Sequence, residues 1–455
     1  MSKKSKELSE DQKNIYTSLL EHLEEVRNGD IFGEHSFLSL AGSAGTGKTF
    51  LISFLVEHLL KNNWKIAIVA PTHQAVKVVR NMIGISHKNL KFASLHAFLG
   101  LKPGEINPET GERKFKRETN KKKKSAISSE KFDLVINDES SMVSHELFSF
   151  IKQEMYQYSR IKSMLLVGDE YQLLPVENSN NNGHSIYNNS KVNQYKLTKI
   201  MRQKDMETIN FVGAIREMIK NKNTKFDLFN FLINERDKEN HTRIVFYKTK
   251  KEFIGEFIKE DRLGSDEDCI FTFTNKDVDN YNEKIRNYYT KTNGVVPEIH
   301  PSDLFVVQES TQPNDLFAQD AFVNSEILHL KRSNFEEFNF KGKIFKGYKC
   351  ITDDGRKFNM IAKESEADYK RACELLKANA IKTKNRENWK IYYDLLNLFL
   401  KVKYHYASTT HKAQGTSVRD AWVDMTDLGY VDDDTLLRLF YVSATRAKRN
   451  IHILI

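Results

Sequence analysis

The sequence predicts an α/β fold with two units, each built from alternating strands and helices. Its 455 residues exceed what one hydrophobic core usually organises, which is ~100–200 residues. Short apolar runs alternate with helical patterns in the N-terminal part of the chain and again near its C-terminus, as in sheets of parallel strands. A glycine-rich segment, Gly42–Thr49, also falls between a predicted strand and a predicted helix.

Composition narrows the class of protein. Hydrophobic residues make up 40% of the chain and charged residues 29%, and no apolar run reaches the ~18 residues of a membrane span. Met1–Glu7 has basic residues but no apolar stretch behind it, so we expect no secretion signal. Cys269, Cys350 and Cys373 form no CxxC pair, which excludes a disulfide framework and fits a reducing cytoplasm. The net charge of +9 favours a polyanionic partner, most simply nucleic acid.

The first α/β unit is predicted from apolar runs separated by helical patterns. The expected strands are Ser36–Ala41, Ile66–Ala70, Phe132–Asn137 and Met164–Val167, and the expected helices include Thr49–Lys61 and Ala75–Met82. This order implies a parallel sheet with both faces covered. The asparagine-rich run Asn178–Gly183 is predicted to be a loop.

An insertion at Leu101–Lys131 interrupts this alternation. It contains the turn signals Pro103-Gly104, Asn107-Pro108 and Thr110-Gly111. Between Glu112 and Lys124 there are eight Lys or Arg residues against two Glu. We therefore expect a β-hairpin with a basic flank.

A second α/β unit begins near Leu197. Its expected strands and helices are Cys269–Phe273, Lys276–Tyr288, Ala421–Met425, Asp433–Arg446 and Ile451–Leu454. The stretch from Val295 to Tyr404 interrupts it, first with strand-like runs that predict a small β-barrel and then with a helical part. The aromatic residues of that helical part, Trp389, Tyr392 and Tyr393, are expected to pack its helices.

The segment Gly42–Thr49 has the GxxxxGK[ST] pattern of a phosphate-binding loop, in the strand–loop–helix context that such a loop requires. Its glycines let backbone N–H groups surround phosphates, and the helix N-terminus adds a positive dipole end. Lys48 is predicted to pair with the β- and γ-phosphates, and the Thr49 hydroxyl to hold Mg²⁺. The residues expected to hold the nucleotide here are Gly42, Gly45, Thr46, Gly47, Lys48 and Thr49.

Acidic residues follow two of the predicted strands. Asp138 and Glu139 stand at the carboxyl end of one strand, where α/β sheets bind ligands. Asp138 suits Mg²⁺ coordination and Glu139 suits polarising the attacking water. Gly168–Gln172 ends the next strand, and Gln172 is expected to contact the γ-phosphate and the water.

Phosphoryl transfer needs further cations, and arginine suits this role through its planar guanidinium. Two candidates come from the second α/β unit. Arg202 lies in Leu197–Gln203, and Arg446 lies in Tyr441–Lys448.

Taken together, the order and wording of these motifs resemble superfamily 1 helicases, and most closely the Dda-type DNA helicases of bacteriophages in the RecD-like branch, superfamily 1B. The further segments that carry this resemblance are Leu8–Lys13 (Q motif), Ala70–Val76 (motif Ia), Ser94–Phe98 (motif Ib), Asp138-Glu139 (motif II), Gly168–Pro175 (motif III), Leu197–Gln203 (motif IV), Thr272–Asn275, Ser408–Gly415 (motif V) and Tyr441–Lys448 (motif VI).

The resemblance implies two RecA-like P-loop NTPase domains with ATP and Mg²⁺ in the cleft between them. Domain 1A would comprise residues 1–97 and 132–199, and domain 2A residues 200–294 and 405–455. A hairpin insertion, 1B, would occupy 98–131, and an SH3-like barrel with a helical extension, 2B, would occupy 295–404. Gln12 would read the adenine and Gly415 would lie at the nucleotide.

The resemblance also implies that single-stranded DNA crosses both domains. Loops at the strand ends would contact phosphates without reading sequence, while Phe98 and Tyr171 would stack bases and Phe115 would be the strand-separating wedge. The positions implied as DNA contacts are Pro71, Thr72, His73, His96, Phe98, Phe115, Tyr171, Thr274, Asn275, Thr409, His411 and Lys412.

We therefore expect an ATP-dependent DNA helicase that acts on single-stranded DNA and forks. The 5′-to-3′ direction is implied by the resemblance alone. Two alternatives are a translocase that displaces bound proteins and a nucleotide-gated DNA-binding or loading module. The resemblance further implies a monomer in a host cytoplasm, with a single-strand-binding, replication or recombination protein as partner.

Overall fold

The computed structural model describes residues 7–31, 33–106, 113–117, 126–174, 192–200, 205–238, 240–259, 265–292, 299, 303–309, 322–383, 385–426 and 431–455. The chain divides into two compact units. Unit 1 comprises Met1–Val245, Gln414–Ser417 and Leu428–Asn450, and unit 2 comprises Phe246–Ala413, Val418–Asp427 and Ile451–Ile455.

Unit 1 is built on a six-stranded parallel sheet with the order β3-β2-β6-β7-β1-β8. Its strands are β1 (Phe37–Gly42), β2 (Ile66–Ala70), β3 (Leu90–Ser94), β6 (Phe132–Asn137), β7 (Ile161–Gly168) and β8 (Asn193–Leu197). The four predicted strands are confirmed. Sequence reasoning missed β3 and β8 because neither is a continuous apolar run, and β8, at the edge of the sheet, alternates between half-buried and exposed side chains.

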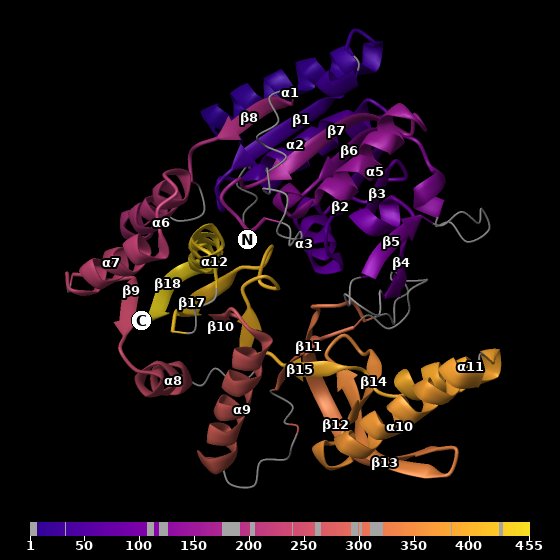
Figure 1. Ribbon diagram of the computed structural model, residues 1–455. Helices are drawn as coiled ribbons and strands as arrows, with labels where there is room; N and C mark the ends of the chain where they lie inside the picture. Colours follow the sequence, from indigo (N-terminus) through magenta and orange to yellow (C-terminus); the bar gives the residue numbers. More distant parts are fainter. Residues whose placement is uncertain are drawn as a thin grey trace. The chain divides into compact units, whose positions relative to one another are not determined.

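Helices cover both faces of this sheet (Figure 1). The helices of unit 1 are α1 (Glu10–Asn28), α2 (Lys48–Lys61), α3 (His73–Ile83), α4 (Leu95–Phe98), α5 (His145–Tyr156), α6 (Met206–Lys220), α7 (Lys225–Arg236) and α12 (Asp433–Thr445), with short 3-10 segments η1 (Gly33–Ser36), η3 (Ala126–Ser129) and η4 (Ser140–Met142). Side chains of α1, α2 and α3 form the core on one face, and side chains of α4 and α5 form the core on the other. The loops at the strand ends therefore extend from a sheet that is packed on both faces.

The insertion after α4 is a β-hairpin, as predicted. Strands β4 (Leu101–Ile106) and β5 (Arg113–Arg117) pair antiparallel, with Pro103 opposite Phe115. Figure 1 shows the pair below α5. The side chain of Phe115 and the run Lys121–Lys124 lie outside the described residues.

A five-stranded sheet with the order β16-β10-β17-β18-β9 is the centre of unit 2. Its strands are β9 (Ile244–Tyr247), β10 (Asp268–Thr272), β16 (Ala407–Thr409), β17 (Val418–Asp424) and β18 (Ala447–Leu454), and helices α8 (Lys250–Lys259) and α9 (Asn275–Thr292) accompany it. The core is aromatic: the buried Trp422 ring stacks on His452 at 3.7 Å between centroids. Tyr247 adds a hydrogen bond from its hydroxyl group to His452 Nδ1 at 2.9 Å.

Unit 2 also contains an antiparallel five-stranded sheet with the order β14-β13-β12-β11-β15. Its strands are β11 (Leu304–Val307), β12 (Ile327–Phe340), β13 (Lys343–Thr352), β14 (Lys357–Ile361) and β15 (Val402–Tyr404). Between β14 and β15 the chain forms two helices, α10 (Lys363–Thr383) and α11 (Arg386–Leu396). Trp389 stacks on Tyr393, and Tyr392 contacts both rings, all within α11. Tyr393 is 50% exposed, so the expected packing between helices stays a prediction. The SH3-like character of the sheet stays a prediction.

The predicted domain boundaries also stay a prediction. The compact units group α6, α7 and α12 with the first sheet, whereas the sequence assigned residues 200–294 and 405–455 to the second α/β domain. The loop Asn178–Gly183 lies outside the described residues. Within the described ranges, no helix has the length and apolar character needed to span a membrane.

Candidate active site at the phosphate-binding loop

The phosphate-binding loop joins β1 to α2, as the sequence predicts. Gly45 and Gly47 adopt φ values of 85° and 83°, which other residues rarely adopt. Space is also short, because a Cβ on Gly42 would come within 2.7 Å of Thr46 Oγ1. The loop therefore requires glycine, and it delivers backbone N–H groups to the N-terminus of α2, an arrangement that binds anions.

Lys48 is the first residue of α2, and its side chain turns back over the loop. Its Nζ atom donates to Gly42 O at 2.6 Å and to Ser43 O at 3.1 Å. Phosphate oxygens placed in the loop can take over these donors, because a charge-assisted hydrogen bond to phosphate is stronger than one to a neutral carbonyl.

Gln12 lies against the same loop. Its amide nitrogen approaches Thr46 O at 3.3 Å and Gly47 O at 3.4 Å, while its amide oxygen accepts from Ser9 N at 3.0 Å in a capping box of α1. The side chain is 2% exposed. Gln12 thus ties the start of α1 to the phosphate-binding loop, and its predicted contact with adenine stays a prediction.

Asp138 and Glu139 follow β6, at the carboxyl edge of the sheet. Burial of the Asp138 carboxyl, and then the negative charge of Glu139, raise the pKa of Asp138 to about 7, while Lys48 acts in the opposite direction. A carboxylate that is buried beside a second negative charge needs a nearby cation to stay ionised. The hard oxygens of Asp138 and Thr49 suit Mg²⁺, which commonly takes only one or two carboxylates and completes its shell with phosphate and water.

Glu139 has a strained backbone. Its φ of 50° is left-handed, although the residue is not glycine. Such conformations cost ~1–3 kcal/mol and gather at active sites. Glu139 Oε1 lies 3.8 Å from where a Cβ on Gly415 would stand, so the predicted water-polarising glutamate and the glycine of motif V are neighbours.

Asp169, in the loop after β7, connects three parts of the site. One carboxylate oxygen, Oδ2, accepts from Ala44 N at 3.1 Å and from the Tyr441 hydroxyl at 2.9 Å, and Oδ1 accepts from Tyr171 N at 3.1 Å. Burial and then Asp169 raise the pKa of Tyr441 well above its usual value, so the phenol stays protonated and donates. Sequence reasoning did not single out Asp169 or Tyr441, although both stand inside quoted motifs.

Gln172 is 3% exposed, and its Oε1 atom has no hydrogen-bond partner among the described residues. Its backbone carbonyl accepts from Arg438 at 2.9 Å, and the same guanidinium nitrogen donates to Glu170 O at 2.7 Å. The loop is therefore held through its backbone by α12, while the Gln172 amide oxygen remains available for a ligand or water.

Arg446 caps the C-terminus of α12 and is 3% exposed. It donates to Val442 O, Thr416 O and the Thr445 hydroxyl at 3.0 to 3.1 Å. Burial lowers the pKa of Arg446, while the charge of Glu139 opposes this shift. Arg446 therefore lies within electrostatic reach of Glu139, and the structure brings this predicted finger into the same unit as the phosphate-binding loop.

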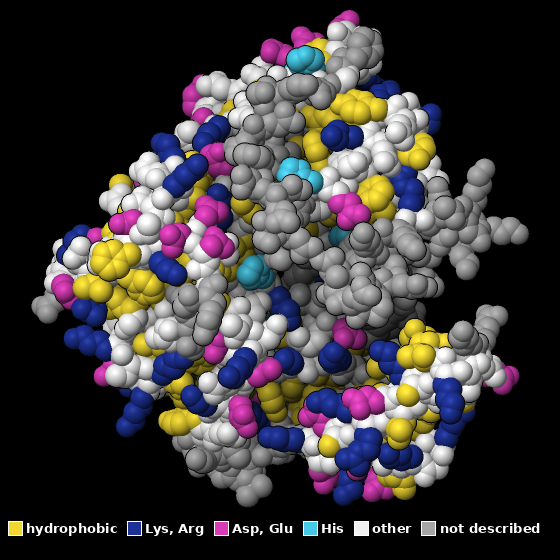
Figure 2. Space-filling model, viewed as in Figure 1, with side chains coloured by type: hydrophobic (Ala, Val, Ile, Leu, Met, Phe, Trp, Pro, Cys, Tyr) yellow, Lys and Arg dark blue, Asp and Glu magenta, His cyan; other side chains and the backbone are white. Residues whose placement is uncertain are grey.

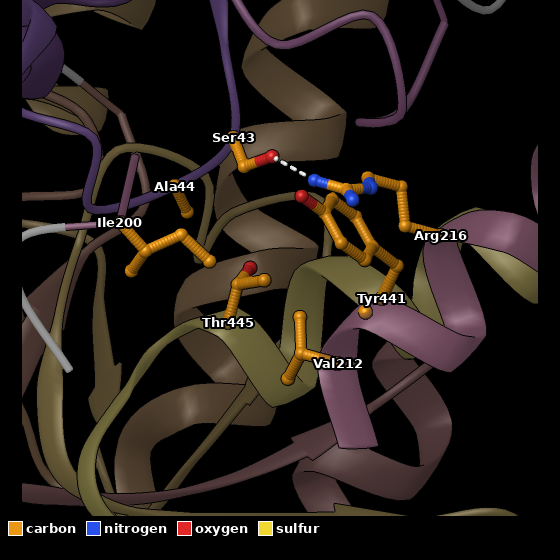
Figure 3. A pocket seen from close by; sticks show the side chains of 8 residues that line it. Ser43, Ala44, Ile200, Val212, Arg216, Tyr441 and Thr445 are labelled. Carbon is orange, nitrogen blue, oxygen red and sulfur yellow. Dashed lines mark hydrogen bonds between the residues drawn. The ribbon is translucent and has the colours of Figure 1, made fainter. Parts of the chain in front are cut away.

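A small pocket lies beside this loop (Figure 3). It is lined by Ser43, Ala44, Ile200, Val212, Gly213, Arg216, Tyr441 and Thr445. Arg216, on α6, points into it and donates to Ser43 Oγ at 3.0 Å. Sequence reasoning missed Arg216, because it lies in a helix outside the recognised motifs. The other predicted finger, Arg202, lies outside the described residues.

Four of the predicted DNA contacts of unit 1, Pro71, Thr72, His73 and His96, lie just after β2 and β3. Pro71 and Thr72 follow β2, and Thr72 caps α3 by accepting from Ala75 N at 3.1 Å. Burial lowers the pKa of His73, and burial and then His73 lower the pKa of His96. Both imidazoles are therefore neutral near pH 7 and can donate to phosphate without carrying a charge.

The base-stacking role of Phe98 is wrong. Its side chain is 0% exposed, its ring packs against Phe132 with 5.7 Å between centroids, and the Arg160 guanidinium lies over the ring, 5.2 Å from its centroid. The helix α4 is a single turn whose end closes the core, so this ring cannot reach a base. Tyr171 is half-buried near Tyr441, Arg216 and Lys196, and its predicted stacking role stays a prediction.

The predicted DNA contacts of unit 2 gather at one edge of its first sheet. Strands β10 and β16 pair in parallel, with Thr272 opposite Thr409, so the residues that follow each strand share that edge. The exposed residues there are Thr274, Asn275, His411 and Lys412. Thr409 itself is only 7% exposed, which leaves its neighbours as the accessible contacts.

Sequence comparison gives one matching family and two informative relatives. The AAA domain family matches residues 30–228. The ATP-dependent DNA helicase dda of Enterobacteria phage T4 is 25% identical, with 98% of each chain covered. An uncharacterised protein of Acanthamoeba polyphaga mimivirus is 26% identical, with 92% of this chain and 96% of its own covered.

Solved structures with a similar fold include two Pif1 helicases. The Bacteroides Pif1 helicase in complex with ADP-AlF3 and ssDNA matches with a TM-score of 0.55 at 17% identity, covering 99% of this chain and 92% of that one. The Candida albicans Pif1 helicase matches with a TM-score of 0.50 at 17% identity, covering 99% and 94%. The parallel strands of the two α/β sheets agree with this likeness, and the predicted pair of RecA-like domains is confirmed.

Proposed function

We propose that this chain, a Dda- and Pif1-like helicase of superfamily 1B, couples ATP hydrolysis to 5′-to-3′ movement along single-stranded DNA and so separates duplex DNA. Its likeness to the phage helicase spans nearly both chains, which confirms the predicted family resemblance. The direction of movement rests on that resemblance.

The observation that supports this proposal is the grouping, in one compact unit, of residues that we expect to carry out hydrolysis. Lys48, Glu139 and Arg446 lie in one compact unit, with Gln172 on the loop after β7. A protein that only binds nucleotide does not need a water-polarising glutamate and an arginine beside it. This set therefore favours the helicase or translocase over the binding or loading module.

Each residue has a distinct task in hydrolysis. Lys48 and the loop amides bind the β- and γ-phosphates of ATP, and Asp138 and Thr49 would hold Mg²⁺. When bound, Mg²⁺ supplies positive charge that polarises the phosphoryl oxygens. Glu139 orients the attacking water and accepts its proton. Arg446 stabilises the negative charge that develops in the transition state.

Hydrogen bonds connect the phosphate-binding loop to α12 and to the loop after β7. Asp169 bonds both Ala44 of the phosphate-binding loop and Tyr441 of α12. Arg438 of α12 bonds the backbone of the loop that carries Gln172. Hydrolysis can therefore shift α12 and the loops that grip DNA, and alternating grips would move the strand. In this proposal the β4–β5 hairpin separates the strands.

Unwinding of a forked duplex tests the proposal. Forks with only a 5′ tail should be opened in an ATP-dependent reaction, while forks with only a 3′ tail should not. Opening of only the 3′-tailed fork would reverse the direction. DNA-stimulated hydrolysis without opening of either fork would favour the protein-displacing translocase, and tight DNA binding without hydrolysis would favour the binding module.

The assembly state belongs to the same proposal. We expect the protein to act as a monomer at single-stranded DNA and forks, alongside a single-strand-binding, replication or recombination protein. Sedimentation of the protein on a forked DNA of defined length measures the number of copies bound. One copy per active fork is the expected result.

A further inference from the structure

The hairpin insertion of unit 1 is fixed to the sheet at its base. Gly100, just before β4, adopts φ of 66°, and a Cβ there would lie 3.3 Å from Ser128 Cβ on the returning segment. Leu101, the first residue of β4, is 6% exposed and belongs to the core under the sheet. The two ends of the insertion are therefore in close contact.

A buried carboxylate on α5, Glu154, contacts the hairpin at this base, where Arg117 stands opposite Leu101. Its side chain is 3% exposed and accepts ion pairs from two arginines. Arg117, the last residue of β5, reaches Glu154 Oε1 at 2.9 Å, and Arg160 pairs with Oε2. A carboxylate at this depth is stable only when it is paired, so its position depends on both arginines.

Arg160 extends the contact to the two ends of the insertion. Its guanidinium donates to Glu130 O and to Ile127 O, both at 3.0 Å. It also lies 5.2 Å from the centre of the Phe98 ring, where the insertion begins. Glu154 and Arg160 together hold the start and the end of the insertion.

Arg117 depends on Glu154 more than Arg160 does. Its guanidinium lies over the rings of Phe150 and Tyr158, at 5.4 and 5.0 Å. Its Nε and second terminal nitrogen are buried and have no acceptor among the described residues. Glu154 is thus the one described acceptor for this arginine, and a neutral side chain at 154 would leave a partly buried cation without a counter-charge among the described residues.

We propose that Glu154 is a positioning residue that locks the β4–β5 hairpin to the sheet of unit 1 through Arg117, so that the hairpin stays in place when it meets a duplex. This inference rests on the proposed function, in which the hairpin separates the strands. Arg117 stands opposite Leu101, where the two strands leave the sheet. A hairpin free to hinge at this base would yield to the duplex, whereas one whose base is held transmits the pull of the translocating enzyme.

The test uses the full-length protein with Glu154→Gln, which keeps the shape of the side chain and removes its charge. Glu146→Gln is the control, since Glu146 is exposed on the same helix. Three quantities are measured: amide hydrogen exchange, ATPase activity on single-stranded DNA, and the rate of fork unwinding. Arg117→Met and Arg117→Lys probe the same contact from the hairpin side.

In Glu154→Gln we expect the β4 and β5 amides to exchange about tenfold faster, while those of β6 and β7 are unchanged. The rate of unwinding should fall by about tenfold, while the ATPase rate stays unchanged. A tenfold change corresponds to a typical coupling free energy between contacting residues. Arg117→Met should match this effect, Arg117→Lys should retain more unwinding, and the double variant Glu154→Gln/Arg117→Met should be no worse than either single one.

Three results would overturn the inference. Unchanged exchange in the hairpin would mean that Glu154 does not hold it. Parallel losses of ATPase and unwinding would make Glu154 an ordinary core residue; if Glu154→Gln does not fold, the Arg117 variants decide. Faster hairpin exchange with full unwinding would remove the hairpin from strand separation. Failure of the wild-type protein to unwind any fork would instead reject the proposed function.

Discussion

At the scale of single residues, the site combines strain with buried charge. Glu139 holds a left-handed backbone directly after Asp138, whose carboxyl has a pKa of about 7 because of burial and then the charge of Glu139. Neither feature stabilises the fold. Both are reasonable at a place where a cation and phosphates are to be bound.

Replacing Glu139 by Gln should therefore slow turnover strongly without destabilising the fold. We expect hydrolysis to slow by roughly 10²–10⁴-fold, the usual contribution of a general base, with nucleotide binding retained. The melting temperature should not fall, because a negative charge beside Asp138 is removed. Single-turnover hydrolysis and thermal unfolding measure both effects. Wild-type turnover in this variant would show that Glu139 is not the base.

Replacing Arg446 by Lys tests the finger. Lysine keeps a charge but loses the planar fork, so turnover should fall, by up to ~10³-fold if Arg446 acts as arginine fingers do in related systems. Binding of a non-hydrolysable ATP analogue should change much less. Arg449→Lys is the control, because Arg449 is exposed on the following strand. Full DNA-stimulated activity in Arg446→Lys would exclude the predicted role.

At the scale of elements, hydrogen bonds join segments that are far apart in sequence. The clearest case is Asp169, which joins the phosphate-binding loop to α12 through Ala44 and Tyr441. A second case is Glu154, which joins the hairpin to α5. Each link is polar and buried, so its loss costs more than an exposed hydrogen bond would.

The hydrogen bond between Tyr441 and Asp169 can be removed by deleting a single oxygen atom. Tyr441→Phe removes the hydroxyl donor to Asp169 and should cost ~0.5–1.5 kcal/mol, equivalent to roughly two- to tenfold in the KM for ATP if the bond matters for binding. Denaturant unfolding and steady-state kinetics measure the two effects. Tyr195→Phe is the control, since its hydroxyl makes a long 3.4 Å bond to Ser18 O. Equal behaviour of the two variants would mean that the link is dispensable.

In unit 2, His405 makes stability depend on pH. Burial lowers the pKa of His405 to about 4, with His329 adding to the shift and Asp266 opposing it, and its Nδ1 has no partner within the described part of the chain. An unfolded histidine has a pKa of ~6.5. Between these values the unfolded chain binds more protons, so the contribution is complete above pH 6.5 and declines as the pH falls towards 4.

Replacing His405 by Asn should therefore flatten the loss of stability between pH 6.5 and 4.5. The neighbouring His329–Asp266 pair, with Nε2 and Oδ2 3.4 Å apart, stays in place and contributes in the opposite direction. Melting temperatures at stepped pH values measure the slope. His87→Asn is the control because His87 is exposed. An unaltered slope in His405→Asn would show that this histidine does not titrate on unfolding.

At the scale of the whole molecule, positive charge exceeds negative charge. The chain has a formal net charge of +9, and on the face drawn in Figure 2 lysine, arginine and acidic side chains are mixed. DNA binding should then depend on many separate phosphate contacts, which is typical of sequence-independent recognition.

Salt dependence measures these contacts. Lys412→Ala should weaken binding to single-stranded DNA and reduce the slope of log affinity against log salt by ~0.7, the value for one lost phosphate contact on a single strand. Alanine at Lys121–Lys124 should reduce it further. Lys61→Ala is the control, because Lys61 is exposed and paired with Glu57. An unchanged slope in the first two variants would place these lysines away from DNA.

Part of the fold and of the candidate site was determined by the sequence alone. The phosphate-binding loop, the motif order and the hairpin were predictable because they depend on local patterns: glycines at a tight turn, carboxylates at strand ends, turn residues between short strands. The family resemblance followed from the same segments. These features need no knowledge of which distant residues meet.

Only the tertiary structure decided the rest. It buried Phe98 in the core, placed Gln12 on the loop carbonyls, brought Arg216 and Tyr441 to the phosphate-binding loop, and set Glu154 between two arginines. Although Gln12, Phe98 and Tyr441 stand in quoted motifs, none of these contacts has a sequence signal, because burial and pairing depend on which surfaces of separate elements come together. The polar edge strand β8 was hidden for the same reason: its partner, β1, lies about 150 residues earlier in the chain, and the hydrogen bonds of a sheet carry no mark in local sequence.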